Sequence, residues 1–285
     1  MAFIFVFFGM MALAIFLFLA CRNTAATSVA VSDNKCSYGL VVVAMGMNER
    51  GAAREWALHH INQGVQYFYI IDNGSTDDWT SELQGLPVTV RRDSTRHQQE
   101  EMYNKYFLDI VRIKAQFVMV IDLDEFVYAR KGETILSTLQ NLSPNVGVVQ
   151  ICWKMFGSNG HVKQPASIIH GFLRRGSIYN SIAHSYYKSI TRTSVLQRLG
   201  VHNPNTIPCE IQVHPLHPTE EFLKNASLQL NHYAIQSREF FSSVKMKRGA
   251  ADQASNEHVR DWKYFEKYDL NDIHDEELSA ITLTR

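Results

Sequence analysis

Cysteine is scarce in this sequence, which limits the kinds of scaffold it can form. The 285 residues include 4 cysteines, at positions 21, 36, 152 and 209, and no Cys-x-x-Cys pair. The missing pairs argue against a structural zinc module. One disulfide among Cys36, Cys152 and Cys209 would suit an oxidising compartment, but the spacing does not select a pair.

An excess of charge of either sign is also missing. Lys plus Arg and Asp plus Glu each number 28, and there is neither a basic run nor an alternation of basic and aromatic residues. Proteins that bind nucleic acid carry a positive surface, so we expect no nucleic-acid partner. The length is sufficient for one large domain with its own core and a short extension.

Charged side chains are absent from residues 1–21, which form a long apolar run. About 20 apolar residues cross a bilayer as a helix. Residues 1–21 are therefore predicted to be a single-pass transmembrane signal anchor, with a signal peptide as the alternative. The polar residues 22–37 are interpreted as a stem. We expect a membrane protein of the secretory pathway, in the Golgi.

From residue 39 onward, short apolar runs alternate with amphipathic segments. The predicted strands cover 40–45, 67–71, 88–90 and 117–121, and the predicted helices cover 52–63, 78–83 and 97–115. In the helix over 97–115, Met102, Tyr106, Ile110 and Ile113 are expected to lie near one face. This order predicts an α/β domain over 38–250, with a doubly wound, mostly parallel sheet flanked by helices.

The pattern is less regular after residue 129. A helix over 133–142, a strand over 146–153 and a charged helical segment over 237–268 are expected. Residues 251–285 are interpreted as a helical, charged C-terminal tail.

Polar loops with acidic residues follow three of the predicted strands. They are Gly46–Arg50, Asp72–Ser75 and Asp122–Glu125. Ligands of doubly wound sheets bind beyond the carboxyl ends of the strands, so the three loops should share one rim. Asp122 and Asp124 are two residues apart, and such side chains point to the same side of an extended chain. Two converging carboxylates suit a Mg²⁺ or Mn²⁺ ion that carries a phosphate. An acidic turn without a ligand is the alternative.

These loops carry a resemblance to a known family. Asn48-Glu49, the segment 72–77 (DNGSTD) and the segment 122–126 (DLDEF) have the order and spacing of family-2-like glycosyltransferases with the GT-A fold. The continuation, with WKMFGS at 153–158, KSI at 188–190, VHNP at 201–204 and NHY at 231–233, resembles glycosyltransferase family 92, also called DUF23. The resemblance covers about residues 38–250.

The resemblance implies a metal-dependent enzyme that transfers a sugar, with inversion, from a UDP- or GDP-sugar to a hydroxyl of a glycan acceptor. The residues implied for the donor are Asn48, Glu49, Asp72, Asp122, Lys245 and Arg248. Those implied for Mn²⁺ or Mg²⁺ are Asp122, Asp124 and His232. Those suggested for the acceptor are Trp153, Phe156 and His161. Glu210 is the first choice for the catalytic base, and Glu239 is the second.

Structural roles are the alternative for several of these residues. Asn48 and Glu49 also fit the start of a helix, Asp72 fits a turn, and Trp153 and Phe156 fit a core. Two other functions stay open as well, a nucleotidyltransferase and a non-catalytic glycan- or nucleotide-binding protein. The loop Gly46–Arg50 lacks the glycine-rich basic pattern of the former, and the intact acidic residues argue against the latter.

Overall fold

The computed structural model describes residues 36–130, 132–177, 186–212, 218–248 and 260–283. The predicted membrane span 1–21 and almost all of the predicted stem lie outside these residues. Among the helices that are described, none combines the length and the apolar composition needed to cross a bilayer.

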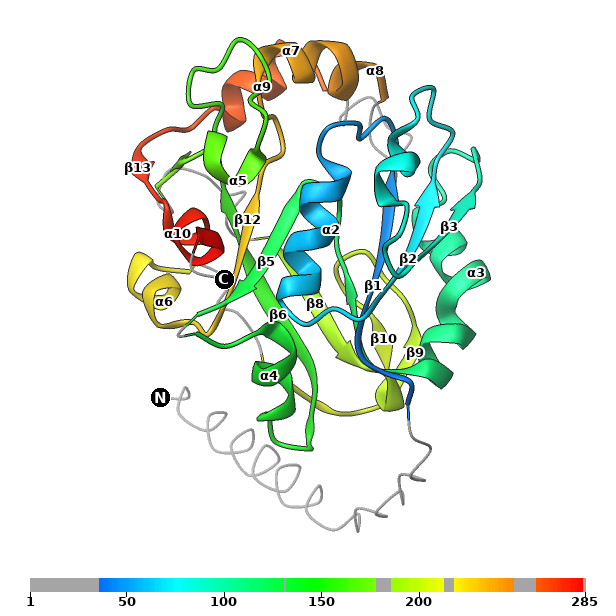
Figure 1. The fold of residues 1–285 in the computed structure, drawn as a ribbon. Coiled ribbons are helices and arrows are strands. Elements are labelled where there is room, and N and C mark those ends of the chain that lie inside the picture. The colour runs from blue at the N-terminus through cyan, green and yellow to red at the C-terminus, as the bar shows by residue number, and fades with distance from the viewer. Residues whose placement is uncertain (1–35, 131, 178–185, 213–217, 249–259, 284–285) are drawn as a thin grey trace, which may run out of the picture. The chain divides into compact units, whose positions relative to one another are not determined.

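A nine-stranded mixed sheet runs through the molecule (Figure 1). Eight strands follow the order β3-β2-β1-β4-β8-β6-β12-β5, and β11 lies beside β6. The strands are β1 (Tyr38–Gly46), β2 (Tyr67–Asp72), β3 (Val88–Arg92), β4 (Ala115–Val120), β5 (Glu125–Ala129), β6 (Val146–Met155), β8 (Tyr187–Arg192), β11 (Glu210–Gln212) and β12 (Leu228–His232).

The parallel half of the sheet agrees with the sequence prediction. Strands β3, β2, β1 and β4 are all parallel, with Val43 of β1 paired to Tyr69 of β2 and to Val120 of β4. The second half differs, because β8 is antiparallel to both β4 and β6, and β5 is antiparallel to β12. The sheet is therefore mixed, and the expectation of a doubly wound sheet is correct only for its N-terminal half.

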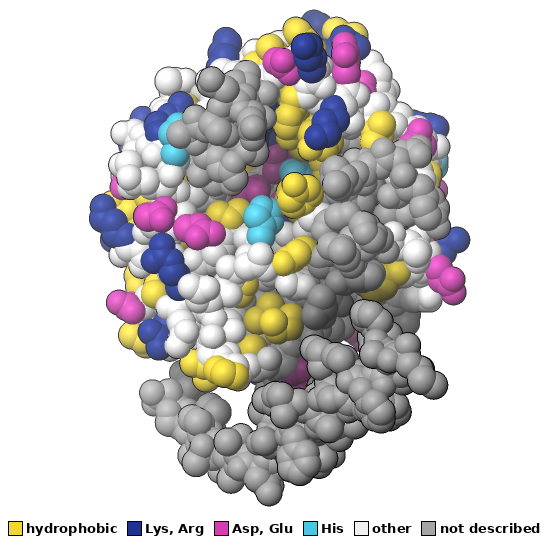
Figure 2. Space-filling model, turned by 180° about the vertical axis from the view of Figure 1, so that it is seen from behind, with side chains coloured by type: hydrophobic (Ala, Val, Ile, Leu, Met, Phe, Trp, Pro, Cys, Tyr) yellow, Lys and Arg dark blue, Asp and Glu magenta, His cyan; other side chains and the backbone are white. Residues whose placement is uncertain are grey.

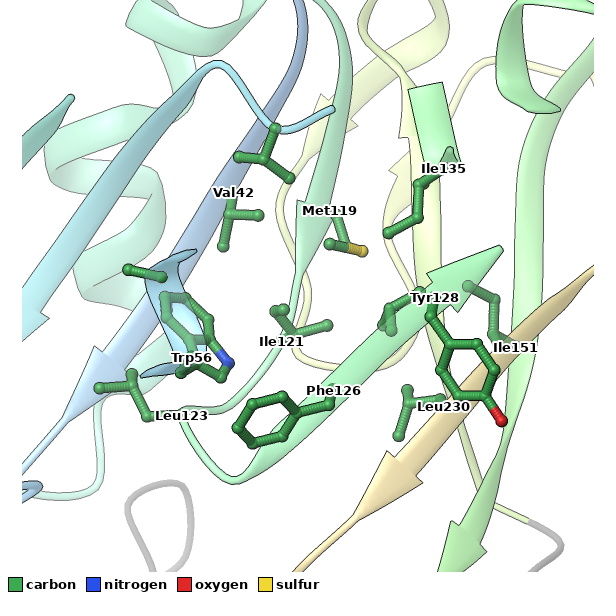
Figure 3. Packing of buried hydrophobic residues seen from close by; sticks show 14 of the residues in the cluster. Val42, Trp56, Met119, Ile121, Leu123, Phe126, Tyr128, Ile135, Ile151 and Leu230 are labelled. Carbon is green, nitrogen blue, oxygen red and sulfur yellow. The ribbon is translucent and has the colours of Figure 1, made fainter. Parts of the chain in front are cut away.

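Helices cover both faces of this parallel half. Helix α2 (Ala53–Asn62) packs on the face of Leu40, Val42 and Ala44, and α3 (Gln99–Lys114) packs on the face of Val41 and Val43. Figure 3 shows Trp56 of α2 together with Leu123 and Phe126 in the larger core. Further helical elements are η1 (Trp79–Leu83), α4 (Ile135–Gln140), α5 (Ile168–Gly171), η3 (Thr193–Val195) and α6 (Glu220–Asn225).

The four apolar residues expected near one face of α3 are not all buried in the structure. Ile110 and Ile113 are 37% and 73% exposed. The buried side chains are instead Gln99, Tyr103, Phe107 and Val111, which lie four positions apart, together with Met102. Both stripes have helical spacing, so the pattern alone does not decide which one faces the sheet.

The predicted helix over 237–268 is also wrong as a single element. The structure has a short helix α7 (Arg238–Phe240), a π-helical turn η4 (Phe241–Lys245), α8 (Met246–Arg248) and, after a gap in the described residues, α9 (Trp262–Tyr268). The small strands are β7 (Arg174–Arg175), β9 (Leu196–Arg198), β10 (Asn205–Thr206) and β13 (Ile273–His274), and α10 covers Glu277–Leu283.

The described part of the predicted C-terminal tail packs into the same compact unit as the sheet. Strand β13 pairs with β7. Asp275, just before α10, and Glu277, its first residue, form ion pairs with buried cations. The Nζ atom of Lys154 lies 3.0 Å from Asp275 and 3.5 Å from Glu277, and the Nε atom of Arg175 lies 2.7 Å from Asp275. We call these residues, with Arg130 on Glu277 and Glu220 on Arg175, the C-terminal ion-pair network.

The thiols of Cys36, Cys152 and Cys209 are free, so the disulfide that the sequence left open is not formed among them. Cys152 is buried, and burial raises the pKa of its thiol to about 12. A thiol of this kind is inert, and we assign it a packing role.

Candidate active site

A cleft lies at the carboxyl ends of the parallel strands. It encloses about 1000 Å³ of space, part of which is open to solvent, and its walls include Glu49, Asn73, Asp122, Asp124 and His232. Figure 2 shows a hollow on the back of the molecule in which acidic and histidine side chains lie next to hydrophobic ones. Three chain segments far apart in sequence thus meet at one rim, as the strand-end rule predicts.

The Asp-Leu-Asp loop is held from behind by α2. Leu123 is buried in the core, whereas Asp122 and Asp124 line the cleft. The indole Nε1 of Trp56 donates hydrogen bonds to the carbonyl oxygens of Asp122 (3.1 Å) and Glu125 (2.9 Å). The Glu125 carboxyl accepts from the backbone N–H of Asp122 at 2.8 Å, and burial raises its pKa well above the usual value. These contacts fix the loop before any ligand arrives.

Asp124 lies between a histidine and a lysine. Its Oδ1 atom is 3.5 Å from Nε2 of His232 and accepts no hydrogen bond, although it is buried. Its Oδ2 atom pairs with the fully buried Lys245, which the π-helical turn η4 presents. Burial opposes the charge on Asp124, but Lys245 and His232 outweigh burial and hold the pKa of this carboxyl well below its usual value.

Asp122 pairs with a lysine that the sequence analysis did not assign to the site. The Nζ atom of Lys188, on β8, is 2.9 Å from Oδ2 of Asp122 and 3.6 Å from Glu125. Burial acts against the charged form of each partner, yet their attraction lowers the pKa of Asp122 and raises that of Lys188. The amide of Gln99 donates to Oδ1 of Asp122 at 3.4 Å. Lysine is rarely buried unless it is paired, so a lysine within a strand that is otherwise buried is the sequence feature that could have pointed to this role.

The donor atoms of Asp124 and His232 fit a divalent metal. The carboxylate Oδ1 and the imidazole Nε2 face one another, and oxygen and nitrogen ligands of this kind suit Mn²⁺. Oδ1 accepts no hydrogen bond, which supports this role, because buried polar atoms are otherwise almost always hydrogen-bonded. Asp122 has partners on both oxygens, and no group of three metal-binding side chains is arranged for a metal in the described parts of the chain.

Of the residues implied for the donor, Glu49, Asp122 and Arg248 line the cleft, whereas Lys245 is buried against Asp124 and does not line it. Glu49 is buried, pairs with Arg248 through Oε1, and has no hydrogen bond to Oε2. Asn48 and Asp72 do not line it. The Oδ1 atom of Asn48 accepts from the backbone N–H of Thr76 at 2.8 Å. Asp72 accepts from the backbone N–H of Ser75 and from Arg92. Asp72 thus braces a turn, which was its structural alternative, whereas Asn48 holds the neighbouring loop and does not cap α2, whose N-cap is Ala52.

The predicted acceptor residues separate in the structure. Trp153 lines the cleft, with its ring 4.3 Å from that of His232. Phe156 is only 1% exposed and packs against Tyr233 in the core. The Nε2 atom of His161 lies 2.8 Å from the carbonyl oxygen of Gly171, and His161 does not line the cleft. An acceptor platform of all three residues is therefore wrong.

Glu210 is not at the site. It is exposed on β11, paired with Val146 at the start of β6, whereas the cleft lies near Trp153 and Met155 at the end of that strand. Seven residues of strand between Val146 and Trp153 correspond to about 23 Å. Glu239, the second choice, accepts from the backbone N–H of Gln164 and does not line the cleft either. Spacing along the sequence did not reveal that β11 joins the opposite end of β6.

The cleft also contains residues that the sequence analysis did not place there. Arg96 and Gln99 come from the start of α3, His202 from the loop after β9, and Arg260, Tyr264 and Tyr268 from α9 and its approach. The rings of Tyr264 and Tyr268 lie 4.6 Å apart. A wall of the cleft thus comes from the range interpreted as a tail.

Comparison with known proteins agrees with the motifs. Residues 52–276 match the model of glycosyltransferase family 92. A glycosyltransferase family 92 protein of Oryza sativa subsp. japonica is 27% identical over 238 residues, which are 80% of this chain and 37% of that protein. One of Ricinus communis is 25% identical over 237 residues, 79% of this chain and 39% of that protein. The chain thus spans about two fifths of the length of these relatives.

Solved structures overlap with part of the fold. TarS of S. aureus (residues 1–349) has a TM-score of 0.35 and 18% identity, over 55% of this chain and 47% of that chain. Glucosyl-3-phosphoglycerate synthase from Mycobacterium tuberculosis has a TM-score of 0.33 and 12% identity, over 57% and 60%. These scores are low, so the assignment depends on the sequence matches. By the match over residues 52–276, the chain belongs to glycosyltransferase family 92.

Proposed function

We propose that this protein is a GT-A-type glycosyltransferase that transfers a sugar from a nucleotide-sugar donor to a hydroxyl of a glycan acceptor. The observation that carries the proposal is the meeting of Glu49, Asp122, Asp124 and His232 in one cleft at the carboxyl ends of parallel strands. The family membership supports it. A nucleotide sugar needs charge neutralisation at its diphosphate, and this cleft supplies cations beside two aspartates.

In the proposed reaction, the acceptor oxygen attacks the anomeric carbon and the bond from that carbon to the diphosphate oxygen breaks. The acceptor proton passes to a base, and direct displacement inverts the configuration. Asp124 and His232 would hold the Mn²⁺ or Mg²⁺ ion, which would stabilise the charge of the departing diphosphate. Arg248 lies close enough to Glu49 and the loop Gly46–Arg50 to orient the donor, and Trp153 offers a flat face to the acceptor sugar.

A panel of nucleotide sugars tests this function without knowledge of the acceptor. With Mn²⁺ present, the full chain should hydrolyse one UDP- or GDP-sugar slowly, because water replaces the acceptor hydroxyl. Released nucleotide diphosphate would be measured for each donor, and calorimetry would report its binding. Absence of both hydrolysis and metal-dependent nucleotide binding across the panel would favour a non-catalytic binding protein.

We also propose that residues 1–21 anchor the protein in a membrane of the secretory pathway. Their uncharged, apolar composition supports this, since about 20 such residues match the thickness of a bilayer. The full chain should stay with the membrane fraction after extraction at alkaline pH, and a variant without residues 1–21 should not. Release of the full chain in that wash would argue against an anchor.

A further inference from the structure

Both aspartates of the cleft already have a cation on one oxygen. Lys188 occupies Oδ2 of Asp122 at 2.9 Å, and Lys245 occupies Oδ2 of Asp124. The Lys188 side chain is 1% exposed and that of Lys245 is 0% exposed, so neither is a solvated surface lysine that happens to reach the site. A side chain held this deeply is part of the built site.

The charges of the site are matched in pairs. Asp122 pairs with Lys188, Asp124 with Lys245, and Glu49 with Arg248. Three carboxylates are therefore each paired with a cation, and Arg96 and Arg260 add further positive charge to the walls of the cleft. A divalent ion added alone would bring two further positive charges next to the two lysines, and charges a few Å apart in a poorly hydrated site repel strongly. A nucleotide-sugar diphosphate carries two negative charges, which would balance that ion.

We propose that Lys188 and Lys245 are built-in counter-ions of the aspartates, which make metal and nucleotide diphosphate enter the cleft together. The lysines hold Asp122 and Asp124 in place while the site is free, and resist a metal that arrives alone. When the diphosphate arrives with the metal, its negative charge offsets the repulsion between the metal and the lysines, and Asp124 is shared between Lys245 and the metal. This inference depends on the proposed function, and it concerns the order of binding at the same site.

The coupling between metal and nucleotide is reciprocal, so each ligand changes the affinity for the other by the same factor. If a lysine weakens metal binding only while the nucleotide is absent, it increases this factor, and the metal then raises the affinity for the nucleotide by more. Direct contact between metal and diphosphate produces coupling too, but that contact is the same in the wild type and in a lysine variant. The difference between the two proteins therefore isolates the contribution of the lysine.

The test measures Mn²⁺ binding to the full chain by electron paramagnetic resonance, with and without UDP or GDP. Without nucleotide, Lys245→Met should bind Mn²⁺ at least about tenfold more tightly than the wild type, a typical size for coupling between sites. The same variant should bind UDP or GDP more weakly in the absence of metal, because a positive partner of the diphosphate is gone. Lys188→Met should shift Mn²⁺ binding in the same direction, and it keeps the test available if Lys245→Met does not fold.

Lys154→Met is the matched control, since Lys154 is a buried lysine whose ion-pair partners are Asp275 and Glu277 and not the aspartates of the cleft. It should bind Mn²⁺ as the wild type does. Equal nucleotide-free affinity for Mn²⁺ in the wild type and both cleft variants would overturn the inference, whereas the proposed function would survive. If no protein binds Mn²⁺ even with UDP or GDP present, the proposed function itself fails.

Discussion

Replacement of Asp124 by alanine should lower sugar transfer by about 10³-fold. A metal that stabilises the leaving diphosphate contributes several kcal/mol to the transition state, and about 1.4 kcal/mol corresponds to a factor of ten in rate. Asp124 contributes the one buried carboxylate oxygen of the Asp122–Asp124 pair that has no hydrogen bond and faces His232. Transfer would be measured with the donor that the hydrolysis panel identifies.

Two variants control this experiment. Asp124→Asn keeps the shape of the side chain and should also lose transfer, which separates lost charge from lost packing beside Lys245. Glu210→Gln should keep wild-type transfer, because Glu210 is exposed at the far end of β6. Full activity of a folded Asp124→Ala protein would exclude the metal role of Asp124, and loss of activity in Glu210→Gln would restore Glu210 as a candidate base.

Replacement of Asp275 by alanine should destabilise the fold by about 3 kcal/mol or more. Removal of one partner of a buried ion pair leaves the other charge without compensation. Here the carboxylate serves two cations, since Oδ2 of Asp275 accepts from Lys154 at 3.0 Å and from Arg175 at 2.7 Å. Glu277 still pairs with Lys154 and Glu220 still pairs with Arg175, so we expect a loss of stability near the lower end of the range for a broken buried ion pair. Urea denaturation would measure the change in unfolding free energy.

The same network predicts that the stability of the fold depends on pH. Burial opposes the charge on Asp275, but Lys154 and Arg175 outweigh burial and lower its pKa from 3.8. Its stabilising effect should therefore be complete above about pH 4 and disappear as the pH falls through the lower, folded-state pKa. The stability difference between the wild type and Asp275→Asn should shrink on acidification. Glu276→Ala, at an exposed neighbour, should change stability little. A constant difference over this pH range would argue against the ion-pair role.

The sequence predicted the part of the fold in which short apolar strands alternate with helices and pair in parallel. In β1, β2 and β4, apolar runs followed by polar loops identified both the parallel strands and the rim where Glu49, Asp122 and Asp124 meet. The antiparallel half could not be read in this way. Strand β8 inserts between β4 and β6 although β5, α4 and β6 come first in the chain. The position of β8 in the sheet depends on tertiary packing. Tertiary packing does not produce a repeating pattern of apolar residues along the sequence, so the sequence did not reveal this position.

The site was predicted where residues share a motif and missed where they meet only in space. Asp122 and Asp124 belong to one motif and were therefore placed together, although they lie in a turn after β4 and not on the extended chain that was expected. Lys188 is 66 residues from Asp122, and Tyr268 lies in a range with no motif, so neither could be placed by spacing. Glu210 failed for the converse reason, because its position along the sequence did not reveal that β11 joins the far end of β6.

The insertion of β8 also limits how this molecule can move. Because β8 is hydrogen-bonded to β4 on one side and to β6 on the other, the walls that carry Asp122 and Trp153 belong to one continuous sheet. Hinge motion of two lobes requires a few flexible residues between them, and eight adjacent strands in register offer no such joint. Any change in access to the cleft is therefore expected to come from its loops and from the helical turns around it, at a fixed separation of its two walls.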